Sequence, residues 1–140
     1  MKQFIAAKGF VTDRNGRVLI IREAPGYAGG TNIGKYDFPG GKIKPGETYR
    51  DALKREALEE CGLDIKVGKP IYVDEWRPVI SGEEIQIIGV YFACEPKKKK
   101  PSVTLAEQYD DHKWITPEEH TNHPIIDTNR KVFEAHLQTA

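Results

Sequence analysis

Residues 41–63 read GKIKPGETYRDALKREALEECGL, and this stretch contains a helix with clearly marked ends. Thr48 is a residue type that caps helix N-termini, and Asp51 follows it at the spacing of a variant capping box. Gly62 suits the position at which a helix stops, because glycine adopts the left-handed conformation there without steric cost. The sequence therefore predicts a helix over residues 49–61.

One face of this helix changes from apolar to acidic along its length. At about 100° per residue, the stripe that should face the core begins with Tyr49, Ala52 and Leu53. Toward the C-terminus the same stripe carries three glutamates: Glu56, Glu59 and Glu60. Like charges at this spacing cost roughly 0.2–0.5 kcal/mol per pair, and the helix dipole disfavours anions at this end.

The glutamate cluster has two interpretations. The simpler one is a solvated acidic face whose repulsion is relieved by the neighbouring Arg50, Lys54 and Arg55. The other is a site for Mg²⁺ or Mn²⁺, because these ions require several hard oxygen ligands that converge on one point. A divalent ion would remove the repulsion, and the position of the cluster on the core-facing stripe favours this second interpretation.

The residues just before the helix support the metal hypothesis. Pro39, Gly40 and Gly41 end a predicted strand and are expected to turn tightly toward the helix, which would let a backbone carbonyl join the metal ligands. Glu47 favours the helix N-terminus electrostatically and would pair with Arg55 if the loop folds back. We expect Glu47 and Arg55 to act first as structural supports.

The rest of the chain predicts strands around this helix, mostly joined by hairpins. Runs rich in β-branched and aromatic residues, together with turn signals such as Asn15-Gly16, favour strands over 3–12, 17–23, 36–38, 64–76, 84–95 and 112–115. A short helix is predicted from residue 116, and a final helix over 127–138. This order predicts a single domain over residues 1–140, with either an α+β fold or an α/β/α sandwich and a mixed sheet.

Composition excludes several classes of protein. The chain has 140 residues, of which 39% are hydrophobic and 30% charged, and its 21 basic residues balance its 21 acidic residues. This balance argues against binding of a nucleic-acid polymer by bulk charge, and the apolar stretches are too short to span a membrane. The two cysteines, Cys61 and Cys94, provide neither a disulfide framework nor metal-ligand spacing. We expect a cytoplasmic protein that is a monomer or a homodimer.

Residues 41–63 resemble the Nudix box. The match consists of Gly41, five residues, Glu47, seven residues, and then the run REALEECGL at 55–63. Ala57 stands where a larger aliphatic residue is usual, which affects helix packing more than chemistry. The preceding segment, 38–42, is similar to the one before the box in MutT-type members. The resemblance implies an α/β/α sandwich with a mixed sheet, and hydrolysis of a nucleoside diphosphate linked to another group, X.

The resemblance also implies roles for the residues of the box. Glu56, Glu59 and Glu60 would hold Mg²⁺ or Mn²⁺, with the Gly40 carbonyl included, and which carboxylate acts as the base varies within the family. The box would be supported by four further residues: Gly41, Glu47, Arg55 and Gly62.

Many members add an acidic residue from a loop that precedes a tryptophan-containing strand. Residues 106–114 fit that place, and Glu107 is the predicted further metal ligand and catalytic residue, with Asp110 and Asp111 as alternatives. A solvated loop acid is the competing interpretation for each of the three.

The substrate is less well determined than the family. A nucleoside triphosphate or oxidised nucleoside triphosphate, in ribo or deoxy form, is the first hypothesis, and the predicted substrate-binding residues are Arg22, Phe38 and Asn129. Asn129 resembles the base-reading asparagine of MutT-type members, although an asparagine at a helix start is commonly a cap. The glycine-rich loop 26–35 is expected to flank the site.

Two alternative functions stay open. ADP-ribose or a nucleotide sugar would be the substrate if Pro78 is the marker seen in ADP-ribose hydrolases. A non-catalytic nucleotide-sensing module is disfavoured, because such modules usually lose box carboxylates and all three are present here.

Overall fold

The computed structural model describes residues 1–26 and 32–139, and its larger sheet is mixed. The strand order is β4 (Gly40–Lys42), β1 (Lys2–Val11), β7 (Glu83–Pro96) and β5 (Ile65–Trp76), and the short β6 (Val79–Ile80) pairs with the start of β7. Strands β1 and β7 run parallel along their length, from the pair Lys2–Ile85 to the pair Val11–Cys94. The other neighbours are antiparallel.

A second, smaller sheet is antiparallel throughout. It has the order β3 (Tyr36–Asp37), β2 (Val18–Glu23) and β8 (Tyr109–Ile115). The turn between β1 and β2 contains the predicted Asn15-Gly16 pair, and Gly16 has a positive φ of 76°. Strand β1 belongs to the larger sheet and β2 to the smaller one, so the chain passes from one sheet to the other at this turn.

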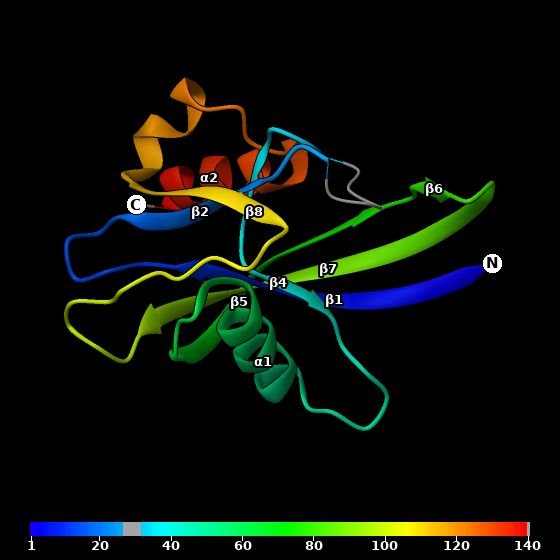
Figure 1. Ribbon diagram of the computed structural model, residues 1–140, viewed down its shortest axis with the longest axis horizontal. Coiled ribbons are helices and arrows are strands. Elements are labelled where there is room, and N and C mark those ends of the chain that lie inside the picture. Colours follow the sequence, from blue (N-terminus) through cyan, green and yellow to red (C-terminus); the bar gives the residue numbers. More distant parts are fainter. Residues whose placement is uncertain (27–31, 140) are drawn as a thin grey trace.

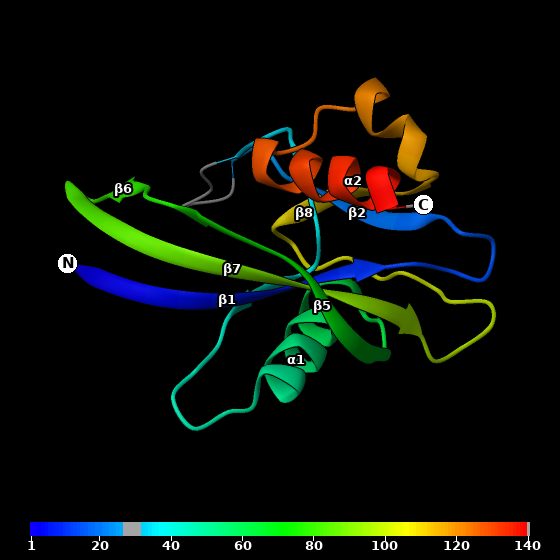
Figure 2. The same cartoon turned by 180° about the vertical axis from the view of Figure 1, so that it is seen from behind.

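The helices lie on opposite sides of the strands, as Figures 1 and 2 show: α1 (Tyr49–Cys61) on one side, and α2 (Asp127–Thr139) with the 3₁₀ helix η1 (Pro117–Asn122) on the other. Alternation along β2 fits this arrangement, since Leu19 and Ile21 pack in the cluster under α1, whereas Val18 and Ile20 pack in the cluster under α2. Both faces of the strand are buried, which explains its continuous apolar run. The predicted α/β sandwich with a mixed sheet is confirmed.

The predicted helix over 49–61 has the same limits in the structure, but the segment before it differs from the prediction. Gly40–Lys42 is not a tight turn: it is strand β4, paired with Ala6–Lys8 of β1. Strand β8 begins at Tyr109 and not at residue 112. Both differences arise because a strand far away in sequence supplies the backbone partners, which local pattern does not reveal. Within the described residues, no helix is long and apolar enough to cross a membrane.

Candidate functional site

Helix α1 has the caps that its sequence predicted. The Thr48 hydroxyl accepts a hydrogen bond of 3.1 Å from the Asp51 backbone N–H. At the other end Gly62 has a φ of 68°, and its N–H donates to the Leu58 carbonyl at 3.0 Å. These caps satisfy backbone groups that a helix end leaves without partners, so the position of the glutamate face is defined by local sequence.

The predicted stripe divides into a packed half and a polar half. Ala52, Leu53 and Ala57 are fully buried, and the Tyr49 ring stacks on Phe92 with 4.7 Å between centroids. The small side chain of Ala57 therefore lies in the closely packed part of the helix. The three glutamates have different exposures: the Glu60 residue is 6% exposed, the Glu56 side chain 18% and the Glu59 side chain 59%.

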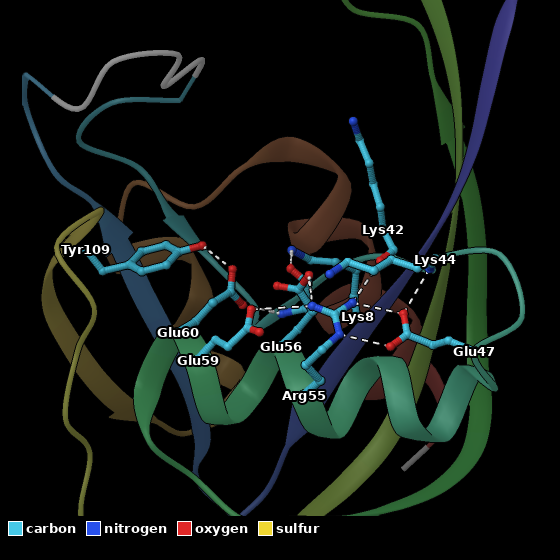
Figure 3. Close-up of polar contacts among 10 residues, drawn as sticks. Lys8, Lys42, Lys44, Glu47, Arg55, Glu56, Glu59, Glu60 and Tyr109 are labelled. Carbon is cyan, nitrogen blue, oxygen red and sulfur yellow. Dashed lines mark hydrogen bonds and ion pairs between the residues drawn. The ribbon is translucent and has the colours of Figure 1, made fainter.

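Glu60 points inward and accepts two short hydrogen bonds. The Gly40 backbone N–H donates to its Oε1 at 2.7 Å. The Tyr109 hydroxyl donates to its Oε2, also at 2.7 Å (Figure 3). Burial raises the pKa of the Glu60 carboxyl to about 7, although the Lys8 ammonium and both hydrogen bonds act to lower it. Glu60 is thus anchored on one side by β4 and on the other by β8.

Arg55 binds the other glutamates of the box. Its Nε and Nη2 donate to the two oxygens of Glu47, both at 2.9 Å, which confirms the predicted pair. Its Nη1 lies 3.1 Å from Glu56 Oε1 and 3.4 Å from Glu59 Oε2 (Figure 3). The hydrogen bonds from Arg55 and from the Lys44 N–H lower the pKa of the Glu47 carboxyl to about 2. The Arg55 guanidinium therefore holds the loop before α1 through Glu47, and it also holds Glu56 and Glu59 of α1.

The Gly40-Gly41 pair is required by close approach. Gly40 has a φ of 135°, and a Cβ there would lie 2.1 Å from the Ala7 carbonyl oxygen. A Cβ on Gly41 would lie 2.9 Å from the Glu56 carboxyl carbon. Both glycines let β4 pass between β1 and the glutamate face.

The three glutamates do not converge on one point as they stand. In residues 1–26 and 32–139 no three acidic, histidine or cysteine side chains are close enough to form a metal-binding group. The reason is that Arg55 holds Glu56 and Glu59, while Glu60 is turned toward Gly40 and Tyr109. Their chemistry nevertheless fits a divalent cation, because they are hard oxygen donors on one helix face and two of them already share a positive charge.

A cavity of about 490 Å³ lies between the start of α2 and residues of β1, β3, β5 and β7. Its wall includes Trp76 from the end of β5, Tyr91 from β7 and Ile126 just before α2. Its polar lining includes three residues, here called the cavity floor: Lys8 of β1, Asp37 of β3 and Asn129 of α2.

The cavity floor is a connected and largely buried set of contacts. Lys8 is 8% exposed and Asn129 is 1% exposed. The Lys8 ammonium donates to Asp37 Oδ2 at 3.0 Å, and Asn129 Nδ2 donates to Asp37 Oδ1 at 2.5 Å. Lys8 Nζ also lies 3.4 Å from the Gly40 carbonyl oxygen, so the same ammonium contacts the cavity floor and the segment next to Glu60. Burial acts to lower the pKa of Lys8, but the carboxylates of Asp37 and Glu60 outweigh burial and raise it.

Known proteins resemble the whole arrangement. A family model described as NUDIX domain matches residues 2–136. The chain belongs to the Nudix family. The protein named CTP pyrophosphohydrolase from Escherichia coli (strain K12) is 28% identical over 130 residues, covering 91% of this chain and 87% of that protein. Nucleoside triphosphatase NudI from Enterobacter sp. (strain 638) is 30% identical over 128 residues, covering 88% and 89%.

Solved structures agree with the family assignment. The crystal structure of the MutT protein from Methanosarcina mazei Go1 has a TM-score of 0.81 at 23% identity, covering 95% of this chain and 91% of that chain. This likeness shows a shared fold. The family model and the named relatives show that the protein is a Nudix hydrolase acting on phosphoanhydride bonds.

The loop expected to add an acidic residue to the Nudix site brings in a tyrosine instead. This loop is held against the end of α1, because the Thr104 N–H donates to the Cys61 carbonyl at 3.0 Å and the Ala106 N–H to the Glu60 carbonyl at 2.9 Å. Glu107 follows directly and is exposed. The residue whose side chain reaches Glu60 is Tyr109, so the metal role of Glu107 stays a prediction.

Asp110 and Asp111, the alternatives to Glu107, contact side chains of β2 and β3 and not Glu60. Asp110 pairs with Arg22 at 2.7 Å, and Asp111 accepts a hydrogen bond from the Tyr36 hydroxyl. Arg22, a predicted substrate-binding residue, also lies over the Tyr36 ring at 5.8 Å. These contacts link β2, β3 and β8. None of the four residues lines the cavity, whereas Asp37, the neighbour of Tyr36, does.

The other predicted substrate residues have different locations. Asn129 lines the cavity, and its contact with the substrate stays a prediction. Phe38 is fully buried in the core, where its ring packs against Phe10 and Phe133 at 5.6 and 5.3 Å between centroids. Successive residues of an extended segment point to opposite sides. Because Asp37 lines the cavity, the side chain of Phe38 points into the core. Residues 27–31 of the predicted glycine-rich loop lie outside the described residues, and Asn32 and Lys35 line the cavity.

Three residues of the site were absent from the sequence prediction: Lys8, Asp37 and Tyr109. Lys8 had a recognisable signal, since it interrupts the otherwise apolar and small run FIAAKGFV at 4–11. A charged residue in such a strand is buried only with a partner. Asp37 and Tyr109 carried no comparable local signal.

Proposed function

We propose that this Nudix enzyme is a Mg²⁺- or Mn²⁺-dependent pyrophosphohydrolase of nucleoside triphosphates or oxidised nucleoside triphosphates, in ribo or deoxy form. Water attacks one phosphorus of the triphosphate, and a phosphoanhydride bond breaks to give a nucleoside monophosphate and pyrophosphate. The observation that carries the proposal is the position of Lys8, whose ammonium contacts both the Gly40 carbonyl beside the glutamate face and Asp37 in the cavity floor. A nucleotide with its phosphates at the glutamates has room for its base in the cavity.

The metal proposal rests on the glutamate face. Glu56, Glu59 and Glu60 would hold the ion, with the Gly40 carbonyl and Glu107 as further oxygen ligands. When bound, a divalent cation neutralises phosphate charge and orients the attacking water. The chain's own contribution is positioning: Arg55 and Glu47 fix the loop and the helix, while Gly40 and Tyr109 fix Glu60.

The named relatives support a nucleoside triphosphate as substrate. One is called a CTP pyrophosphohydrolase and the other a nucleoside triphosphatase, and each matches most of this chain. The proposal also retains a cytoplasmic monomer or homodimer, in keeping with the balanced charge and the two buried, unpaired cysteines.

ADP-ribose or a nucleotide sugar is a second candidate substrate, and one observation favours it. Pro78, the sequence marker for that class, lies in the wall of the cavity beside Trp76. The non-catalytic alternative has less support, because the Nudix box keeps all of its carboxylates and its supporting ion pair.

A substrate panel tests the proposal directly. The purified protein is assayed with Mg²⁺ on ribonucleoside and deoxyribonucleoside triphosphates, 8-oxo-dGTP, ADP-ribose and UDP-glucose. Phosphate and pyrophosphate are measured for the triphosphates. For ADP-ribose and UDP-glucose the nucleoside monophosphate and sugar phosphate are measured by chromatography, because their cleavage releases neither inorganic ion. We expect pyrophosphate from at least one triphosphate, and loss of the activity in EDTA. Faster cleavage of ADP-ribose or UDP-glucose would establish the second candidate, and no cleavage of any compound would establish the sensing module.

A further inference from the structure

The cavity floor holds an asparagine whose orientation is determined by a neighbouring charge. Within the described part of the chain the Asn129 side chain makes one hydrogen bond, from Nδ2 to Asp37 Oδ1 at 2.5 Å. An ionised carboxylate accepts but does not donate, so the NH₂ group of the amide must face Asp37. The atom that remains for a ligand is therefore Oδ1, a hydrogen-bond acceptor.

Asp37 is itself held in place from the other side. Its Oδ2 accepts from the Lys8 ammonium at 3.0 Å, and Lys8 is nearly buried in the central strand β1. The opposite charges of Lys8 and Asp37 neutralise one another, so the cavity floor carries no net charge toward a ligand. Lys8 has three N–H donors, and it lines the cavity next to the Asn129 amide.

The walls of the cavity suit a flat aromatic ring. A Cβ on Gly89 would lie 2.6 Å from the Trp76 ring, so the indole lies directly on the backbone of β7, where a larger residue would displace it. Ile80, Ile87 and Ile126 add apolar surface. The Tyr91 hydroxyl, also at the cavity, is buried without a hydrogen-bond partner of ordinary geometry in residues 1–26 and 32–139. Such a cavity offers stacking surface and unused polar groups to a nucleobase.

We infer that Asp37 is a specificity-determining positioning residue, which fixes the Asn129 acceptor toward the cavity so that the site prefers bases with an amino group at the position of cytosine N4 or adenine N6. This inference rests on the proposed nucleotide function. The amino group of cytosine or adenine is a donor with a ring-nitrogen acceptor beside it, which matches Asn129 Oδ1 and a Lys8 N–H. Uracil and guanine present a keto oxygen at the corresponding position, which meets the Asn129 acceptor unfavourably.

CTP and UTP make the sharpest comparison, because they differ in this group and have nearly the same shape. In the wild-type protein we expect kcat/KM for CTP to exceed that for UTP by about tenfold, with the difference in KM. In Asp37→Asn the amide of Asn129 is no longer forced to present its oxygen, so the ratio of kcat/KM for CTP to that for UTP should fall toward one. Asp64→Asn is the matched control, because Asp64 also pairs with a lysine, Lys97, but on the exposed surface at 3.5 Å.

Asp37→Asn leaves the Lys8 charge without its counterion, so circular dichroism is used to check that the variant folds. If it does not fold, the double variant Lys8→Met with Asp37→Asn removes the buried charge pair and takes the same test, with Lys8→Met alone as its reference because Lys8 itself offers an N–H to the base. A CTP-to-UTP ratio within twofold in the wild type, or an unchanged ratio in whichever variant folds, overturns the inference.

Binding of CMP and UMP without metal separates this inference from the proposed function. Calorimetry should show tighter binding of CMP than of UMP, and loss of the difference in Asp37→Asn. If no triphosphate is cleaved but CMP is still preferred, the hydrolase proposal fails and the role of Asp37 stands. If triphosphates are cleaved but CMP and UMP bind equally, the hydrolase proposal stands and the role of Asp37 is wrong.

Discussion

The glutamate face of α1 and the cavity floor lie next to each other, but their charges are arranged differently. Around Arg55, one guanidinium is shared by three carboxylates, those of Glu47, Glu56 and Glu59, and Glu60 is buried beside them. In the cavity floor, Lys8 and Asp37 pair one to one and Asn129 completes the set. The first region has an excess of negative charge, whereas the second is balanced.

This difference assigns different ligands to the two regions. An excess of carboxylates is stabilised by a cation, so the glutamate face suits a divalent metal and the phosphates that it binds. The cavity floor has no net charge and offers one hydrogen-bond acceptor, Asn129 Oδ1. It therefore suits an uncharged base that carries a hydrogen-bond donor. Metal dependence and base preference should therefore be separable by mutation. Lys8 is the residue that links the cavity floor to Gly40, whose N–H holds Glu60.

The largest effect is expected at the glutamate face. Glu60→Gln removes the charge of a proposed metal ligand but keeps the size of the side chain and its bond from the Gly40 N–H. Loss of a metal ligand removes several kcal/mol of transition-state stabilisation, so kcat should fall by at least about a hundredfold. Steady-state assays should show the same fall for CTP and UTP. A changed CTP-to-UTP ratio would show that the two regions are not independent. The control is Glu83→Gln, because Glu83 is an exposed glutamate that pairs with Lys2 at 3.5 Å.

Metal binding should also appear as a gain in stability. A ligand at 100 times its Kd stabilises the folded state by about 2.7 kcal/mol, so millimolar Mg²⁺ or Mn²⁺ should raise the melting temperature. The triple change of Glu56, Glu59 and Glu60 to Gln should abolish the response in thermal scans, because no anionic ligands remain on the helix. An unchanged wild-type melting temperature would favour the solvated acidic face, and an equal response in the triple variant would place the metal elsewhere.

A smaller effect is expected at the cavity floor. Asn129→Ala removes the acceptor and leaves Asp37 Oδ1 with the Phe38 backbone N–H as its remaining donor. This change should raise KM for CTP by about tenfold. The Mg²⁺ concentration that gives half-maximal rate should stay the same, since Asn129 does not touch the glutamate face. Steady-state assays over a range of Mg²⁺ measure both quantities. If KM for CTP and UTP is unchanged, Asn129 is only part of the start of α2.

The smallest effect concerns the support of the box at low pH. The pKa of Glu47 is about 2 in the folded protein against an ordinary value of 4.5, so the Glu47–Arg55 pair adds stability above pH 4.5 that is lost as the pH falls toward 2. Glu47→Gln removes this contribution, and its stability should fall less steeply than that of the wild type across that range. Urea unfolding at pH 2.5 to 6 measures the two slopes, and parallel slopes would contradict the assignment.

Local sequence determined the helix of the box and the contacts within it. Thr48 and Gly62 cap a helix whose limits agree with the prediction, and Arg55 meets Glu47 at 2.9 Å as expected. Caps, helical periodicity and a short loop act over a few residues, so their result can be deduced from the order of residues alone. The family and the mixed-sheet sandwich followed from the same stretch.

Tertiary structure decided which side chains complete the site. Lys8 meets Asp37 29 positions later, Asp37 meets Asn129 92 positions later, and Glu60 meets Tyr109 49 positions later. Each pair depends on strand register: residue 37 faces the cavity, and Phe38 therefore enters the core. Even the Gly40-Gly41 segment, expected as a turn, became strand β4 because β1 supplies its backbone partners. A contact between distant segments depends on how the whole chain packs, and a pattern confined to one segment does not contain that information.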